Sequence, residues 1–183
     1  MKQANKEVFY ADEQIVKVGW QDIEFLKERV GDTERKRIRL CAHKGVDDKL
    51  QEMFIVLAKG TYIRPHKHLN KAESLHVIEG SADVVFFDEA GAITDTIRLG
   101  EYSSGHRFYY RVTEPVYHTL LVHSKVLVFH EATLGPFLRS DTVFAPWAPD
   151  ESDVAATRAF TEQLEQTSAD YIARRGGHHE GKT

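Results

Sequence analysis

The sequence lacks the features that mark secreted, membrane-bound and nucleic-acid-binding proteins. Cys41 is the only cysteine among 183 residues, so no disulfide can form within the chain, which fits a reducing compartment. The amino terminus has no apolar core of a signal peptide, and no apolar run is long enough to span a bilayer. A formal net charge of -4 argues against a nucleic-acid partner held by bulk electrostatics. We therefore expect a soluble, cytoplasmic protein that binds neither nucleic acid nor membrane.

Long helical patterns are also missing between residues 35 and 135. Turn residues such as Gly60, Gly80 and Gly100 separate short segments whose side chains alternate in polarity or are mostly apolar. These strand-like runs cover residues 35–43, 53–58, 61–67, 74–79, 82–87, 95–99, 107–112, 117–122 and 125–131. Many short strands broken by such turns predict an all-β sandwich or barrel.

Helical spacing is confined to the two ends of the chain. Near the start, Trp20, Leu26 and Val30 fall on one face of a predicted helix, and Gly31 is placed to end it. We therefore expect residues 1–34 to form a helical N-terminal extension. The strand-rich domain that follows should cover residues 35–149.

The C-terminal part, residues 150–183, predicts a second helix followed by a flexible polar tail. Phe160 and Leu164 share a helix face, and Asp150 is the expected N-cap. Before this helix, residues 135–149 hold three of the five prolines, which predicts an extended segment lying over the barrel.

One segment, residues 60–80, carries most of the functional information. His66 and His68 are separated by one residue, so on a β-strand both side chains point to the same face. A short loop then brings Glu73 back on the next strand-like run. Two imidazoles and a carboxylate that converge on one point form a site for a divalent metal ion.

The spacing Gly-x5-His-x-His-x4-Glu-x6-Gly, filled here from Gly60 to Gly80, resembles the first motif of the cupin superfamily. The second cupin motif is matched in part, by Pro115 and His118, without its inner glycine and final asparagine. The resemblance implies a cupin-type double-stranded β-barrel, or jelly roll, with a helical extension before it and a helix after it. The metal ligands that the resemblance implies are His66, His68, Glu73 and His118.

Further segments narrow the resemblance to the WbuC family of cupin-fold metalloproteins. They include Arg37-Ile-Arg-Leu-Cys-Ala-His43, Phe108-Tyr-Tyr-Arg111 and Phe144-Ala-Pro-Trp-Ala-Pro149. Members of this family occur in bacterial gene clusters for surface-polysaccharide synthesis, which suggests a sugar or sugar nucleotide as the small-molecule ligand. The family implies a fold and a metal but no particular reaction. Because barrels of this type often dimerise, we expect a homodimer.

The ligand types leave the identity of the divalent metal open. Imidazole nitrogens with one carboxylate suit iron, manganese, zinc, nickel or copper. Four protein ligands would close a tetrahedral zinc site, whereas catalytic zinc keeps a position for water. We therefore favour iron(II) or manganese, which would retain open positions.

Tyr62 and Arg64, which precede the histidine pair, are candidates for lining a pocket beside the metal. Strand parity places Tyr62 and Arg64 on the same face as His66 and His68. There, Arg64 could hold a carboxylate or phosphate through two parallel hydrogen bonds. The alternative is a rim arginine paired with a surface acid.

Two later strands supply further pocket candidates. Either Tyr109 or Tyr110 should face the interior, where Tyr109 could donate a proton or a hydrogen bond. Likewise His130 or Glu131 should point inward, and His130 is a candidate base or partner of a ligand. His76 has the opposite parity to Glu73 on its strand, and we interpret it as a histidine that binds no metal.

Arg37, Arg39, Cys41 and His43 alternate along one predicted strand. They could form an anion-binding wall with a thiol whose pKa the cations lower. The alternative is an exposed edge strand whose like charges discourage aggregation. We favour the edge strand for Arg35 and Arg37, and both interpretations stay open for the other three residues.

The metal constellation favours a metal-dependent enzyme of undefined reaction type that acts on a small polar or anionic molecule. One alternative is a barrel that binds or senses a small ligand without turnover. Another is a structural protein that pairs through an edge strand. Fold alone does not choose among them, because one scaffold hosts unrelated chemistries.

Overall fold

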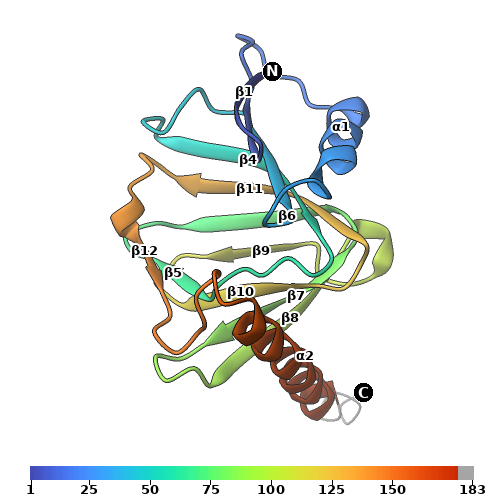
Figure 1. Cartoon of the computed structure of the whole chain (residues 1–183), viewed down its shortest axis with the longest axis vertical. Helices are drawn as coiled ribbons and strands as arrows, with labels where there is room; N and C mark the ends of the chain where they lie inside the picture. Colours follow the sequence, from blue (N-terminus) through green and yellow to red (C-terminus); the bar gives the residue numbers. More distant parts are fainter. Residues whose placement is uncertain (177–183) are drawn as a thin grey trace, which may run out of the picture.

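Short strands with inward-facing apolar side chains build two β-sheets, which the computed structural model of the chain shows packed against each other (Figure 1). The structure describes residues 1–176, so all but the first residue of the tail expected at 176–183 lies outside the described residues. Strand pairs are antiparallel except that β2 runs parallel to β3.

The seven-stranded sheet has the order β1-β2-β3-β4-β11-β6-β9. In that order its strands are Lys2–Asn5, Val8–Tyr10, Arg37–Cys41, Leu50–Ala58, Val126–Leu134, Glu73–Glu79 and Tyr109–Val112. The five-stranded sheet has the order β12-β5-β10-β7-β8. Its strands are Thr142–Phe144, His66–His68, Tyr117–Val122, Ser81–Phe87 and Ile93–Gly100.

The main core lies between the two sheets. Leu57 and Val77 of the seven-stranded sheet pack in one cluster with Val84 and Val122 of the five-stranded sheet. Each of these residues belongs to a strand whose alternate side chains turn to the same face, so the inward set is apolar. The predicted all-β barrel with a helix near each end is confirmed.

Two parts of the strand pattern differ from expectation. Of the run predicted at 61–67, only His66 and Lys67 enter a sheet, as part of β5, His66–His68. Pro65 has no N–H to give to a strand ladder, which explains why the strand starts after it. The N-terminal extension, predicted as helical, also contains the hairpin β1–β2, and β2 pairs with β3.

Helix α1, Trp20–Val30, covers the outer face of the seven-stranded sheet. Its apolar stripe, with Leu26 and Val30 at 0% and 3% exposure, packs on Ile38 and Val128. The predicted helix and its apolar face are confirmed, but Trp20 at its first position is 74% exposed and packs in neither cluster.

Leu26→Ala is expected to lower the free energy of unfolding by about 2–5 kcal/mol, because it removes fully buried apolar volume. Trp20→Ala is the matched control on the same helix and should change it by less than about 0.5 kcal/mol, because Trp20 is exposed. Urea titration of both variants measures the difference. Equal losses would show that α1 does not pack on the sheet through Leu26.

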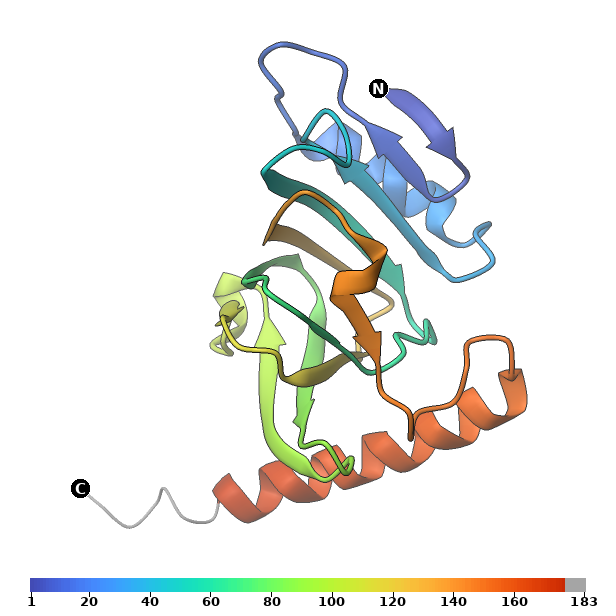
Figure 2. The same ribbon diagram turned by 90° about the vertical axis from the view of Figure 1, so that its left-hand side faces the viewer.

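Helix α2, Val154–Gly176, lies at the opposite end of the molecule from α1 and the N-terminal hairpin (Figure 2). Phe160 and Leu164 pack against Trp147, as the predicted helix face requires. The expected N-cap was wrong: Asp153, directly before the helix, accepts the bond from the Ala156 N–H at 2.9 Å, and the helix starts at Val154, four residues after Asp150. Within the described residues, no helix is long and apolar enough to cross a membrane.

Gly80 is the motif position at which glycine is sterically required. It joins β6 to β7 with φ +89°, and a Cβ there would lie 2.3 Å from the Val126 carbonyl oxygen. A left-handed backbone with no room for a side chain explains why glycine ends the metal-binding motif.

Candidate metal centre

Three imidazoles from two neighbouring strands converge inside the barrel. His66 and His68 stand on β5, and His118 on β10 lies directly opposite His66 in the antiparallel register. One ring nitrogen from each lies within 4.8 Å of the others. The His66 ring centroid is 4.9 Å from that of His68 and 4.8 Å from that of His118. Strand alternation and pairing therefore gather nitrogens that are distant in the sequence.

The facing sheet contributes the carboxylate of Glu73, at the start of β6. Its Oε2 lies 3.1 Å from His68 Nε2, and its Oε1 lies 3.4 Å from His118 Nε2. The buried hydroxyl of Tyr110 donates to Oε1 at 3.4 Å. Two donor atoms that each lie about 2.1 Å from the same ion, at right angles to each other, are about 3 Å apart. The two separations between Glu73 and the imidazoles are close to that spacing, whereas the three ring nitrogens lie within 4.8 Å of one another.

Each imidazole is oriented by a partner on its other nitrogen. His66 Nδ1 donates to the Arg64 carbonyl at 2.8 Å, and His118 Nδ1 donates to the Val116 carbonyl at 2.9 Å. His68 Nδ1 lies 3.3 Å from Thr142 Oγ1. A carbonyl oxygen only accepts, so the bonded Nδ1 carries the proton and Nε2 keeps its lone pair. Metal-binding histidines are held in this way.

The charges within the cluster also suit a cation. Burial and the neighbouring imidazoles lower the pKa of His66 to about 3, so its ring is neutral. Burial alone would raise the pKa of Glu73, but its contacts with His118 and His68 outweigh it and hold that pKa well below its usual range, while Glu73 in turn raises the pKa of His118 against the effect of burial. A neutral imidazole and an ionised carboxylate are the forms that bind metals.

The donor set therefore fits a divalent metal ion. His66, His68 and His118 form the cluster of possible ligands, and Glu73 meets two of them. The structure thus brings all four predicted ligands together, and their coordination of a metal stays a prediction. The mixture of nitrogen and oxygen donors does not distinguish among iron, manganese, zinc and nickel.

A cavity of about 500 Å³ opens onto this cluster. His66 belongs to both, and Arg64 and Phe144 also line the cavity. The Arg64 guanidinium lies 5.2 Å from the centre of the Phe144 ring, which is itself 6.2 Å from the His66 ring. Arg64 also bonds Asp150 at 2.8 Å. The predicted anion clamp is thus at the cavity, and it is also paired with an acid.

Three other pocket candidates lie away from this cavity. The Tyr62 hydroxyl donates to the Pro149 carbonyl at 2.9 Å, and its ring faces Phe160 of α2. Tyr109 is 49% exposed on the outer face of β9. His130 is on the outer face of β11, beside Phe54. The inward positions of these two strands are taken by Tyr110 and Glu131.

The edge-strand interpretation of Arg35 and Arg37 was wrong. Strand β3 lies between β4 and β2, which pairs with its residues 39–41, and Arg35 precedes the strand. Both arginines line the cavity together with Arg39. Cys41 is buried, and burial raises the pKa of its thiol, contrary to the lowered value considered from the sequence. His43 Nδ1 lies at hydrogen-bonding distance, 3.0 Å, from the backbone carbonyl oxygen of Glu52.

Glu131 is the cavity residue with the most unusual electrostatics. Burial, and then the charge of Glu73, raise its pKa to about 8 against the opposing effects of Arg39 and His118. A carboxyl group with such a pKa is mostly protonated at pH 7 and can donate a hydrogen bond or a proton. Its parity on β11, shared with the buried Phe129, is the sequence signal that identifies it as inward-facing.

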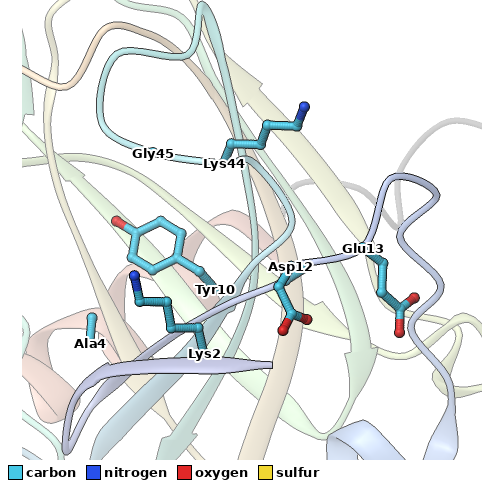
Figure 3. A pocket seen from close by; sticks show the side chains of 8 residues that line it. Lys2, Ala4, Tyr10, Asp12, Glu13, Lys44 and Gly45 are labelled. Carbon is cyan, nitrogen blue, oxygen red and sulfur yellow. The ribbon is translucent and has the colours of Figure 1, made fainter.

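A second pocket lies at the N-terminal hairpin, away from the histidines (Figure 3). It has a volume of about 470 Å³, with Lys2 and Tyr10 side by side at one edge and Lys44 on the facing loop. None of the predicted ligands lines it. Asp12 on its rim is already paired with the N-terminal ammonium at 3.0 Å.

Comparison with known proteins supplies a partial family match. The sequence model of a domain of unknown function, DUF6016, matches residues 20–99, which is less than half of the chain. A search of curated proteins found no match.

Several solved structures are similar to this chain. A protein from Shewanella oneidensis is 14% identical over 68% of this chain and 77% of its own, with a TM-score of 0.47. An RmlC-like cupin family protein with a double-stranded β-helix fold, from Methanocaldococcus jannaschii, is 15% identical over 68% and 92% of the two chains, with a TM-score of 0.44. A mutant oxalate decarboxylase from Bacillus subtilis is 23% identical over 54% of this chain but 25% of its own, with a TM-score of 0.43.

At these identities and TM-scores, the fold assignment rests on the strand order and pairing of this chain. The chain has the cupin-type double-stranded β-barrel fold.

Proposed function

We propose that this protein is a metal-dependent enzyme acting on a small anionic molecule. One observation supports this function above the others: His66 belongs both to the imidazole cluster and to the wall of the cavity that the arginines line. A molecule in that cavity would meet the metal site at one end and guanidinium groups elsewhere. A concave pocket that gathers polar groups at fixed positions is typical of ligand sites.

Different residues around the cavity would carry different steps of catalysis. A metal bound at the cluster would polarise a substrate oxygen or lower the pKa of a bound water. The arginines of the cavity, of which Arg64 is already paired with Asp150, would orient an anionic group of the substrate, and Phe144 would exclude water beside His66. Glu131, mostly protonated at pH 7, would donate a proton on the cavity side of the cluster.

Several finer features also belong to this proposal. The WbuC resemblance supports a sugar or sugar nucleotide of surface-polysaccharide synthesis as the substrate. We also propose a cytoplasmic location and, because barrels of this type often dimerise, a homodimer. Light scattering coupled to size-exclusion chromatography tests the dimer directly, because one chain has a mass of 20.9 kDa. A monomeric mass at micromolar concentration would contradict it.

A turnover screen separates the enzyme from a ligand-binding protein. Metal-loaded protein is incubated with a mixture of sugars, sugar phosphates and organic acids, and consumption is followed by NMR. The proposal expects at least one compound to be consumed in molar excess over the protein, and His68→Ala to abolish that consumption. Ligand-induced line broadening without any consumption would instead favour the non-catalytic binding or sensing barrel.

A further inference from the structure

Five arginines face the cavity beside the metal cluster, an unusual density of one charge for a space of about 500 Å³. They come from β3, from the segments that precede β3 and β5, and from the segment between β11 and β12. The five are Arg35, Arg37, Arg39, Arg64 and Arg139.

Three of these guanidinium groups are neutralised by the protein. Arg35 forms a two-pronged hydrogen bond with Glu7. Arg37 Nη1 lies 3.3 Å from Glu151 Oε1. Arg64, as described above, bonds Asp150. A ligand that bound these three would have to compete with carboxylates already in place.

The remaining two guanidinium groups have no such partner. Within residues 1–176, neither Arg39 nor Arg139 forms an ion pair with a carboxylate, and the polar contact of Arg39 is a 3.9 Å approach to Met53 Sδ. Both side chains are exposed at the cavity wall. The third acid of the cavity, Glu131, forms no ion pair with either of them within the described residues. Two positive charges are thus available to a ligand.

Part of the wall is apolar. Ile55, Leu57, Ile63 and Phe144 line the same cavity. A bare inorganic ion would leave this surface unused, whereas an organic group would bury it. The volume lies within the range of about 300–1,000 Å³ that is common for small-molecule sites.

We infer that the cavity binds an organic phosphate monoester, with its phosphoryl group at Arg39 and Arg139 and its organic part on the apolar wall toward His66. This inference rests on the proposed function and names the substrate class. A phosphate monoester carries a charge of about -1.5 to -2 at pH 7 and three acceptor oxygens. Two guanidinium forks match both the charge and the acceptors.

Calorimetric titration of the metal-loaded protein tests this class. The titrants are glucose 1-phosphate and glycerol 3-phosphate, with glucose, glycerol, inorganic phosphate and succinate as comparisons. At least one ester should bind with a dissociation constant below about 1 mM and at least tenfold more tightly than its parent alcohol, inorganic phosphate and succinate. Binding of succinate as tightly as the esters, or no ester bound below that limit, would overturn the assignment.

Charge-removing variants locate the binding site. Arg39→Gln and Arg139→Gln should each weaken ester binding roughly 10- to 100-fold, as expected for losing a charged hydrogen-bonding partner. Arg158→Gln is the matched control, because Arg158 is 81% exposed on α2 and pairs with Glu162. Unchanged affinity in the Arg39→Gln, Arg139→Gln double variant would overturn the inference.

The two proposals fail in different ways. His68→Ala should lose metal and turnover but keep ester binding within about tenfold, since the phosphoryl contacts lie on other side chains. Ester binding without metal or turnover in the wild-type protein would refute the enzyme and leave the anion site standing. Metal-dependent turnover of compounds without phosphate would support the enzyme and refute the ester class.

Discussion

His118→Ala is expected to lower the metal content of the purified protein from about one ion per chain to a trace. The substitution removes one of three converging nitrogens and also separates Glu73 from a partner at 3.4 Å. Loss of a group that only orients a metal ligand costs roughly 10- to 100-fold in affinity, and loss of the ligand itself should cost more. Elemental analysis of protein purified without chelators or a metal-affinity column measures the change.

Histidines on the outer face of the same barrel provide matched controls. His130→Ala and His76→Ala remove imidazoles from neighbouring strands, and neither residue belongs to the cluster. Both variants should retain the metal content of the wild-type protein. Equal metal in the His118→Ala protein, or equal loss in all three variants, would show that the cluster is not the binding site.

Asp83→Asn is expected to lower the free energy of unfolding by about 2–4 kcal/mol. Asp83 is 1% exposed, accepts two bonds from Arg98 at 2.8 and 3.0 Å, and lies 3.0 Å from His123 Nε2. Ser168 of α2 donates to the same carboxylate at 3.4 Å, so the variant should also loosen the helix. The cost lies below that of a fully buried pair because Arg98 is 43% exposed and water can solvate it.

Asp95→Asn is the control for this network. Asp95 stands on the adjacent strand β8 and pairs with Arg175 at the surface, so the change should cost less than about 1 kcal/mol. Chemical denaturation of both variants, monitored by circular dichroism, gives the two values. A loss as small for Asp83→Asn as for Asp95→Asn would contradict a structural role for the buried carboxylate.

The same carboxylate predicts an acid limit. Burial would raise the pKa of Asp83, but hydrogen bonds from His123 and Arg98 outweigh this effect and lower it to about 2. Because the pKa in the folded protein is below the ordinary 3.8, this stabilisation is present above pH 3.8 and is lost as the pH falls toward 2. In the Asp83→Asn protein, the fall in unfolding free energy between pH 4 and 2 should be smaller than in the wild type.

Local patterns predict much of the fold and the arrangement of the metal cluster. His66 and His68 alternate with Lys67, and this period of two is enough to place both rings on one face. The turn at Gly80 and the apolar stripe of α1 are likewise properties of a few neighbouring residues. Such features depend on the backbone geometry of residues that are close in the sequence, so the sequence alone predicts them.

Features that depend on pairing between distant segments could not be predicted. Which of Tyr109 and Tyr110 faces inward depends on the register of β9 with β6, and a shift of one residue exchanges them. No pattern in residues 1–34 predicts that β2 pairs with residues 39–41 of β3, so the sequence alone indicates an edge strand there. The pairing state of Arg39 and Arg139 likewise depends on where distant acids lie.

The position of the metal tests the central claim most directly. A crystal structure with anomalous diffraction recorded at the metal's absorption edge would locate the ion. The peak should lie about 2.0–2.2 Å from the Nε2 atoms of His66, His68 and His118 and from a Glu73 oxygen. A metal bound elsewhere, or no peak at the cluster in crystals soaked with iron(II), manganese, zinc and nickel in turn, would contradict it.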